Sequence, residues 1–425
     1  MTRPASPFSF RDFRYYWGAR LASTLAQNAM VVVIGWQVYD IARRTMGTRE
    51  AALQLGLVGV AQFVPLLALT LVVGWTADRI DRRWIARTAV LLEAGCAAML
   101  ALLAWHGTTT LPALFAIAAL LGVARAFASP ALSALAPNLV PPATLPTAIA
   151  TSSIAWQVGA VLGPAAGGYL YAAGHWAPYA VAAVLFGASF LALNLIGPIP
   201  RTSLDRGANP WAQMIDGLRY VRRNRLVLGA ISLDLFAVLL GGATAMLPIY
   251  ARDILQVGAE GLGHLRAAPA VGSACTALFF TFRPLRYNVG VKMLIAVGVF
   301  GAATVLFGIS RFMPLSLACL ALLGSADMFS VYVRQSLIQI YTPNDMRGRV
   351  GAVSTLFISG SNELGEAESG FLAALIGPVA AVIAGGVGAV CVTLLWARWF
   401  PELKNARTFE SPRSFEDVPG QERAT

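Results

Sequence analysis

The sequence predicts an all-α integral membrane protein with twelve transmembrane helices in two pseudo-symmetric halves of six. Of its 425 residues, 57% are hydrophobic and 12% are charged, and the mean hydropathy is +0.65. Soluble chains carry about twice that share of charged residues. This composition excludes a soluble enzyme, a disordered chain and a nucleic-acid-binding module. The net charge of +11 does not alter that conclusion, because the basic residues form short clusters between apolar runs.

Each apolar run is long enough to cross a hydrocarbon core of about 30 Å at about 1.5 Å per helical residue. Twelve such crossings place both chain ends on one side of the membrane. The runs cover residues 17–40, 53–75, 84–105, 111–134, 147–172, 177–197, 227–250, 262–282, 291–310, 314–338, 350–376 and 378–400.

Basic residues indicate which side that is. They gather in the connections between spans 2 and 3, 6 and 7, and 8 and 9, whereas the connections between spans 3 and 4, 5 and 6, and 11 and 12 contain no Lys or Arg. Arg43, Arg44 and Arg49, between spans 1 and 2, are the main exception. The positive-inside rule therefore predicts that both termini lie in the cytoplasm.

The longest internal connection divides the chain into two halves. We expect an N-terminal half at 1–197, a cytoplasmic linker at 198–226, a C-terminal half at 227–400 and a disordered cytoplasmic tail at 401–425. The linker is either an amphipathic helix on the membrane surface or a solvated basic segment.

The two halves resemble each other at a few positions. Arg125 and Arg334 occupy equivalent places in spans 4 and 10, and residues 163–168 in span 5 match 365–370 in span 11. Two homologous halves imply a substrate site at their interface, near the middle of the bilayer.

The loop between spans 2 and 3 carries a recognisable motif, with Gly74, Asp78, Arg79, Arg82 and Arg83 at fixed offsets. It resembles the signature loop of the major facilitator superfamily. The resemblance implies that Asp78 meets the positive N-terminal end of span 11, near residues 349–351, and forms a cytoplasmic gate. The alternative is a basic loop that only anchors the chain at the inner surface.

Span 5 carries a second motif, consisting of Gly159, Gly163, Pro164, Gly167 and Gly168. It resembles the antiporter motif of superfamily exporters, although Ala150 replaces the expected earlier glycine. Small residues at this spacing let helix backbones touch, so simple helix packing is the alternative interpretation. The motif favours export over import.

The resemblance extends over nearly the whole chain to the bacterial drug and siderophore exporter branch, which includes enterobactin exporters. It implies a proton-coupled efflux antiporter for a small amphipathic compound that works by alternating access. A proton-coupled importer is one alternative, and a lipid flippase or non-transporting membrane protein is another. We expect no cofactor beyond the proton gradient, and as partners only the substrate and the lipid bilayer, with no nucleic acid and a monomeric chain.

Acidic residues inside the spans need a partner or a role, because each costs a few kcal/mol there. Glu363 and Glu366 share one face of span 11, whereas Glu368 points elsewhere. We predict that Glu363 and Glu366 carry the coupling proton, with Asp327 nearby and Arg125 or Arg334 as counter-charge. The alternative is that the acids only pair with arginines and hold helices together.

In the superfamily, spans 1, 4, 7 and 10 line the substrate cavity. Aromatic surfaces with a few charges suit an amphipathic molecule better than a sugar. The resemblance therefore nominates a set of mostly aromatic residues, which are Trp36, Tyr39, Phe236, Phe329, Tyr332 and Arg334, together with Arg125 and Asp327.

A membrane enzyme is the remaining rival class. His106, His175 and His264 match no metal or nucleophile motif, and the four cysteines have no ligand spacing. We therefore expect neither an enzyme nor a metal site.

Overall fold

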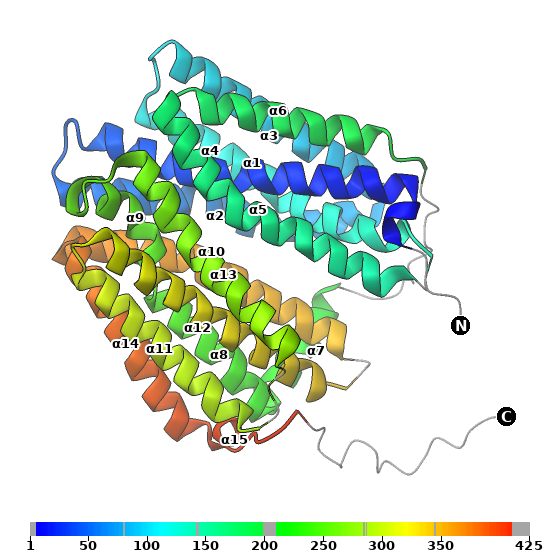
Figure 1. Ribbon diagram of the computed structural model, residues 1–425. Coiled ribbons are helices and arrows are strands. Elements are labelled where there is room, and N and C mark those ends of the chain that lie inside the picture. The colour runs from blue at the N-terminus through cyan, green and yellow to red at the C-terminus, as the bar shows by residue number, and fades with distance from the viewer. Residues whose placement is uncertain are drawn as a thin grey trace.

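The computed structural model describes residues 6–79, 81–141, 144–198, 210–283, 285, 287–343 and 346–409. Within these ranges the chain is helical throughout, with no strand, which confirms the predicted all-α membrane fold. Figure 1 shows two bundles side by side, one built from the N-terminal half of the chain and the other from the C-terminal half.

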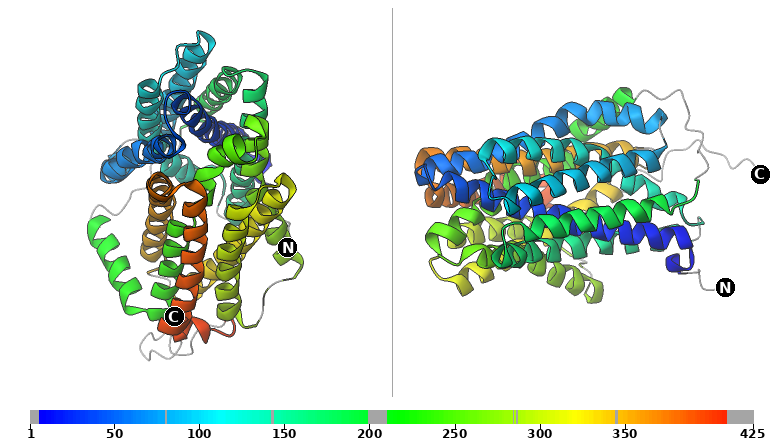
Figure 2. Two further views of the ribbon diagram at one scale, coloured as in Figure 1. Left: turned by 90° about the vertical axis from the view of Figure 1, so that its left-hand side faces the viewer. Right: turned by 90° about the horizontal axis from the view of Figure 1, so that it is seen from above.

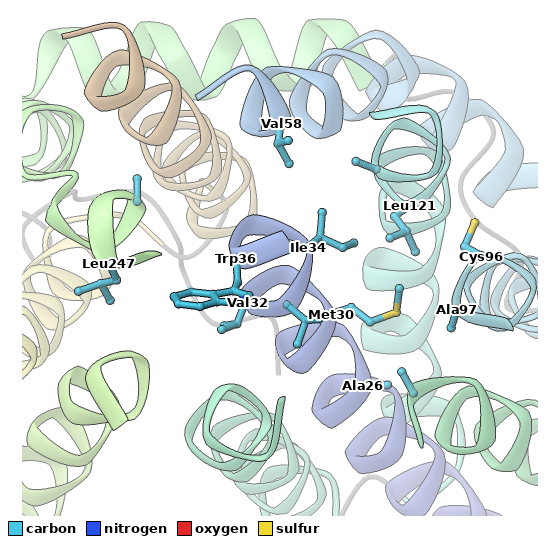
Figure 3. Close-up of a cluster of buried hydrophobic side chains, with 14 of the residues drawn as sticks. Ala26, Met30, Val32, Ile34, Trp36, Val58, Cys96, Ala97, Leu121 and Leu247 are labelled. Carbon is cyan, nitrogen blue, oxygen red and sulfur yellow. The ribbon is translucent and has the colours of Figure 1, made fainter. Parts of the chain in front are cut away.

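The N-terminal bundle centres on α1, which packs against α5 and α6, while α3 packs against α4 and α6 and α2 packs against α4. Its helices are α1 (Arg11–Ala42), α2 (Thr48–Arg79), α3 (Arg82–Trp105), α4 (Leu111–Leu135), α5 (Leu145–Ala173) and α6 (Ala177–Asn194). Figure 3 shows side chains along α1, including Met30 and Ile34, among Val58 of α2, Leu121 of α4 and Cys96 of α3.

The C-terminal bundle pairs α11 with α12 and α14, and α10 with α12. A linker helix, α7 (Pro210–Arg223), precedes it. The helices of the C-terminal bundle are α8 (Arg225–Leu240), α9 (Leu247–Ile249), α10 (Gly258–Phe282), α11 (Val289–Ile309), α12 (Met313–Ile340), α13 (Arg347–Ile376), α14 (Pro378–Trp399) and α15 (Pro401–Lys404).

The seventh span is not one continuous helix. α8 ends at Leu240, and the chain continues through a 3-10 turn, the short α9 and a π-helical turn at Tyr250–Ile254. The break falls at Gly241 and Gly242, and a Cβ on Gly242 would lie 2.7 Å from the carbonyl oxygen of Gly365 in α13. Non-helical backbone at membrane depth is tolerated where protein surrounds it.

Ten helical segments in the described residues are long and apolar enough to span a membrane. The other two predicted spans correspond to α5 and α13, which are 29 and 30 residues long. Most helices begin a few residues earlier than the apolar runs suggest. α1, for example, starts at Arg11 rather than at residue 17.

The predicted tail begins as ordered chain. α15 follows α14 directly, and its Leu403 is completely buried against the C-terminal bundle. Burial of this apolar side chain holds the start of the tail against the bundle. Residues 410–425 lie outside the described residues.

In Figure 1 the start of α1, α7 and α15 lie at the same end of the bundle, and the right-hand view of Figure 2 shows the start of α1, in dark blue, at one end as well. We call this end the terminal face; it includes α7 and α15. The opposite end, the distal face, includes the loops at 43–47, 106–110, 174–176, 255–257 and 310–312.

Glycine sets the closest helix approach in the C-terminal bundle. A Cβ on Gly324 of α12 would lie 2.6 Å from Pro269 Cα of α10, whereas a Cβ on Gly187 of α6 would meet nothing within 4 Å. We expect Gly324→Ala to force α10 and α12 apart and to lower stability by about 1–3 kcal/mol. Thermal unfolding of the purified protein in detergent checks this, with Gly187→Ala as the control that leaves the transition unchanged. Equal melting temperatures for the two variants would contradict this packing.

Candidate transport site and gates

An ionic cluster joins the two halves at the distal face. We call it the distal latch; it consists of Tyr39, Asp40 and Arg43 at the end of α1 and Arg252 and Asp253 in the π-helical turn. Asp253 Oδ2 accepts from Tyr39 Oη at 2.6 Å and from Arg43 Nε at 3.0 Å. Arg252 Nη1 lies 3.0 Å from Asp40 Oδ1. These side chains are partly buried, so solvent screens them less than a surface pair.

Below the latch, glycines bring the backbones of the two halves into contact. A Cβ on Gly56 of α2 would lie 2.8 Å from Gly370 Cα of α13, and a Cβ on Gly168 of α5 would lie 2.8 Å from Gly263 Cα of α10. Beside the second contact, Tyr169 Oη and His264 Nε2 form a hydrogen bond. The hydrogen bonds and ion pairs between described residues of the two halves thus lie at the distal face, which is closed.

The antiporter-like motif has two contact surfaces. A Cβ on Gly159 would lie 2.6 Å from Thr24 Cγ2, and one on Gly163 would lie 2.8 Å from the carbonyl oxygen of Leu25. Gly167 likewise approaches Ala29 of α1, and the helix continues through Pro164. Only the last glycine, Gly168, meets the opposite half. The motif therefore joins α5 to α1 and also contributes to distal closure.

The signature-like loop is described in part. Gly74, Asp78 and Arg79 fall in a stretch whose side chains lie outside the described residues, so the proposed Asp78 gate stays a prediction. Arg82, the first residue of α3, is half-buried. The first turn of α13, which the gate would involve, contacts α7, where Arg349 Nη1 lies 3.6 Å from Asp216 Oδ2.

The end of this loop anchors α3 to α6. Asp81 caps α3 by accepting from the Arg83 backbone N–H at 3.0 Å. Arg83 Nη2 lies 2.7 Å from Asp81 Oδ2, and Arg83 Nη1 donates to the carbonyl oxygen of Gly197 at 2.6 Å. The hydrogen bonds from Arg83 lower the pKa of Asp81, since they favour its charged form.

Polar side chains in the middle of the N-terminal bundle bind one another. Arg125 Nη1 of α4 donates to Gln62 Oε1 of α2 at 3.2 Å, and Gln27 Nε2 of α1 donates to Glu93 Oε1 of α3 at 2.6 Å. Glu93 is completely buried. These contacts join α4 to α2 and α1 to α3, and they meet the need of intramembrane charges for partners.

The C-terminal bundle holds a buried ion pair. Arg334 of α12 pairs with Asp234 of α8, and the two residues are only 2% and 6% exposed. A cavity of about 10 Å³, lined by Asp234, Asp327 and Ser330 among others, adjoins the pair. It has room for about one water molecule. Arg334 thus bonds within its own half in this conformation.

Of the predicted coupling acids, Glu366 lies at the contact between the halves. A Cβ on Gly59 of α2 would lie 3.6 Å from Glu366 Cβ and 3.8 Å from Glu366 Oε2, so the glycine leaves room for this carboxyl group. Arg266 of α10 interacts electrostatically with Glu366. The side chain of Glu363 lies outside the described residues, and Glu368 is half-buried.

The nominated aromatic residues lie in three different places. Trp36 and Tyr39 are buried on α1 in an apolar cluster that includes residues of both halves, with Tyr39 in the distal latch. Tyr332 stacks on Phe280 of α10, with ring centroids 4.4 Å apart, and Phe329 contacts the same ring. Phe236 is 38% exposed and packs against Trp396. The structure thus groups Phe329 with Tyr332 and separates the others.

Sequence reasoning missed two groups of residues. Arg252 and Asp253 were overlooked because they follow the seventh apolar run, although an adjacent Arg and Asp at a span end is a visible signal. Arg266 is an intramembrane arginine whose buried Nε has no hydrogen-bond partner among the described residues. Its position in an apolar run should have marked it as a candidate. No group of His, Cys, Asp and Glu that could hold a metal occurs in the described part of the chain.

Comparisons with known proteins agree with this architecture. The family model described as transmembrane secretion effector matches residues 2–419. Enterobactin exporters EntS of Escherichia coli O1:K1 (APEC) and of strain E2348/69 (EPEC) are each 29% identical over 402 residues, which is 93% of this chain and 93% of theirs.

Solved structures share the fold at low sequence identity. A bacterial homologue of the human lysosomal transporter Spinster, inward-facing and unoccupied, has a TM-score of 0.72 at 15% identity, covering 92% of this chain and 98% of that one. The nucleoside transporter NupG has a TM-score of 0.71 at 13% identity, covering 90% and 98%. The chain is therefore a multi-pass membrane protein that belongs to the transmembrane secretion effector family of the major facilitator superfamily.

Proposed function

We propose that this protein exports a small amphipathic organic compound, drug-like or siderophore-like, in exchange for protons. The whole-chain match to a secretion family is the observation that carries the proposal. Relatives named as enterobactin exporters, aligned over 93% of both chains, support export of a compound of that kind. The aromatic pair Phe329 and Tyr332, beside intramembrane charges, suits such a substrate.

We further propose that the terminal face lies in the cytoplasm of a bacterial inner membrane. Exposed Arg222 and Arg223 of α7 lie on this face, whereas distal loops 106–110 and 174–176 contain no Lys or Arg. Two of the three exceptional distal arginines have acidic partners, since Arg43 pairs with Asp253 and Arg44 with Asp40. In this orientation the closed distal face is the outer gate, and the conformation is inward-facing.

Glu366 supplies a route from proton binding to conformational change. A charged carboxylate held against Gly59 between packed helices costs a few kcal/mol. A neutral carboxyl group fits that contact better, so protonation favours distal closure. A proton taken up on the outside then returns the carrier to the inward-facing state. Release inside, aided by Arg266 nearby, would loosen the contact and let the loaded carrier open outward.

Substrate-triggered proton release from everted membrane vesicles tests the function. The vesicles are energised and challenged with dyes, antibiotics and catechol-type iron chelators, with vesicles lacking the protein as control. An antiporter releases protons from the lumen when it meets its substrate. Accumulation of substrate in intact cells would indicate an importer, and flux of labelled lipid would indicate a flippase.

Replacement of the coupling acids should block both proton-driven transport and substrate exchange. We expect Glu363→Gln and Glu366→Gln to lose most of both activities, because a neutral amide mimics the protonated acid, which favours distal closure and cannot release a proton. Counterflow of radiolabelled substrate in proteoliposomes, compared with transport driven by a pH gradient, measures both activities.

Glu368→Gln is the matched control, with the same change on the same helix at a position outside the shared face. It should leave both activities near the wild-type values. Full proton-driven transport in both Glu363→Gln and Glu366→Gln would contradict the assignment.

Weakening the distal latch should open the distal face more often. Asp253→Asn removes the charge that holds Tyr39 and Arg43, and we expect a shift of about 1–2 kcal/mol, or about 5–30-fold in the open population. Ala52 on α2 is completely buried beside Gly370. A cysteine placed there, in a chain lacking the native cysteines, should react correspondingly faster with an impermeant maleimide added from the distal side.

Glu50→Gln serves as the control for this experiment, since Glu50 is an exposed acid at the same face that bonds only to its own turn. Its labelling rate should stay at the wild-type level. A rate for Asp253→Asn that equals the Glu50→Gln rate would mean that the latch does not hold the gate.

A further inference from the structure

The terminal face of the C-terminal bundle carries an open cavity, lined by polar and apolar groups, that the transport mechanism does not use. Its volume is about 820 Å³, and it is lined by Tyr220, Arg223, Asn224, Arg225, Leu226, Tyr341, Glu402, Asn405 and Ala406. These residues come from α7, α8, the end of α12 and the region of α15. The lining belongs to the linker and the C-terminal half and lies apart from the distal contact between the halves.

One wall of the cavity is held in place by specific contacts. Arg225 Nε lies 2.7 Å from Glu402 Oε1, and Arg225 Nη2 donates to the carbonyl oxygen of Trp399 at 2.8 Å. Tyr220 Oη donates to the carbonyl oxygen of Tyr341 at 2.6 Å. These bonds tie the first turn of α8 to α15 and the end of α7 to α12, so the cavity is a built feature.

Arg223 is the cation in the lining without a partner. It is exposed, and within the described part of the chain it makes no hydrogen bond or ion pair, whereas the charge of Arg225 is balanced by Glu402. Exposed Arg222, Lys404 and Arg407 lie next to lining residues in the chain, and exposed Arg398 lies in the last turn of α14. The surroundings are therefore strongly positive, and the ligand chemistry that fits is an anion such as a phosphate.

The same region is suited to the membrane interface. Gly217 and Val221 of α7 pack against α13. Ile215 and Leu218 therefore face outward, where they are 50% and 47% exposed. Arg219 and Arg222 lie beside them on α7. Trp399 at the end of α14 is 55% exposed. Apolar side chains among arginines, with a tryptophan alongside, are typical of a helix lying at the headgroup level of a bilayer.

We propose that this cavity binds the headgroup of an anionic phospholipid, with Arg223 contacting the phosphate, Asn405 in the same lining, and Ile215 and Leu218 of α7 contacting the acyl chains. The proposal goes beyond transport and holds whichever compound is carried. A lipid bound there would fasten the linker helix and the start of the tail to the C-terminal bundle.

Native mass spectrometry of the full-length protein in neutral detergent tests the site. We expect phosphatidylglycerol to bind more tightly than phosphatidylcholine. Arg223→Gln should weaken phosphatidylglycerol binding about fivefold, which corresponds to about 1 kcal/mol per basic residue at an anionic surface. Asn405→Asp places a negative charge in the lining and should weaken phosphatidylglycerol binding at least as much.

Arg222→Gln is the matched control, with the same charge change one residue away and outside the lining. It should reduce binding less than Arg223→Gln does. Equal losses in the two variants would mean diffuse surface attraction and would overturn the proposal. So would equal binding of phosphatidylcholine, or saturable binding of inorganic phosphate that displaces phosphatidylglycerol, since that outcome indicates a site for a soluble anion.

Discussion

Backbone contact between glycines of the two halves is the constraint on which the rest of this structure depends. Gly56 meets Gly370 and Gly168 meets Gly263, so helices from different halves touch without intervening side chains. Such contacts gain van der Waals packing in a membrane, where no hydrophobic effect drives helices together. Gly168 and Gly370 are also equivalent positions in the two matching halves. Pseudo-symmetry therefore supplies two sealing points between the halves.

Charges inside each half are paired so that each bundle can move as a unit. Asp234 with Arg334, and Gln27 with Glu93, connect helices of one half only. Removing one partner of a buried pair costs about 3–5 kcal/mol, so these bonds persist while the halves reorient. The ionic groups that cross between the halves are the partly exposed ones of the latch, together with Glu366 beside Gly59. Because the buried bonds within each half cost more to break than the contacts between the halves, the two bundles move relative to each other more readily than their helices rearrange internally.

Local pattern predicted much of the fold, because spans, loops and motifs are signalled by nearby residues. The apolar runs locate the helices to within several residues, and the glycines of span 5 indicated close packing. The break at Gly241 and Gly242 could not be predicted, since it depends on the contact between Gly242 and Gly365 in α13. The partners of Asp253, Arg266 and Arg334 were likewise hidden, because such pairs join residues far apart in the chain. Hydropathy predicts the depth of a residue in the membrane, but it does not predict which residue of another helix lies beside it.

Distances between spin labels on the two halves test alternating access most directly. In a chain without native cysteines, one pair of labels replaces Thr45 and Glu260 at the distal face, and another replaces Trp84 and Tyr287 at the terminal face; all four residues are exposed. Because protonation favours distal closure, raising the pH should lengthen the distal distance and shorten the terminal one. Distances that stay fixed, or that change in the same direction at both faces, would contradict the account.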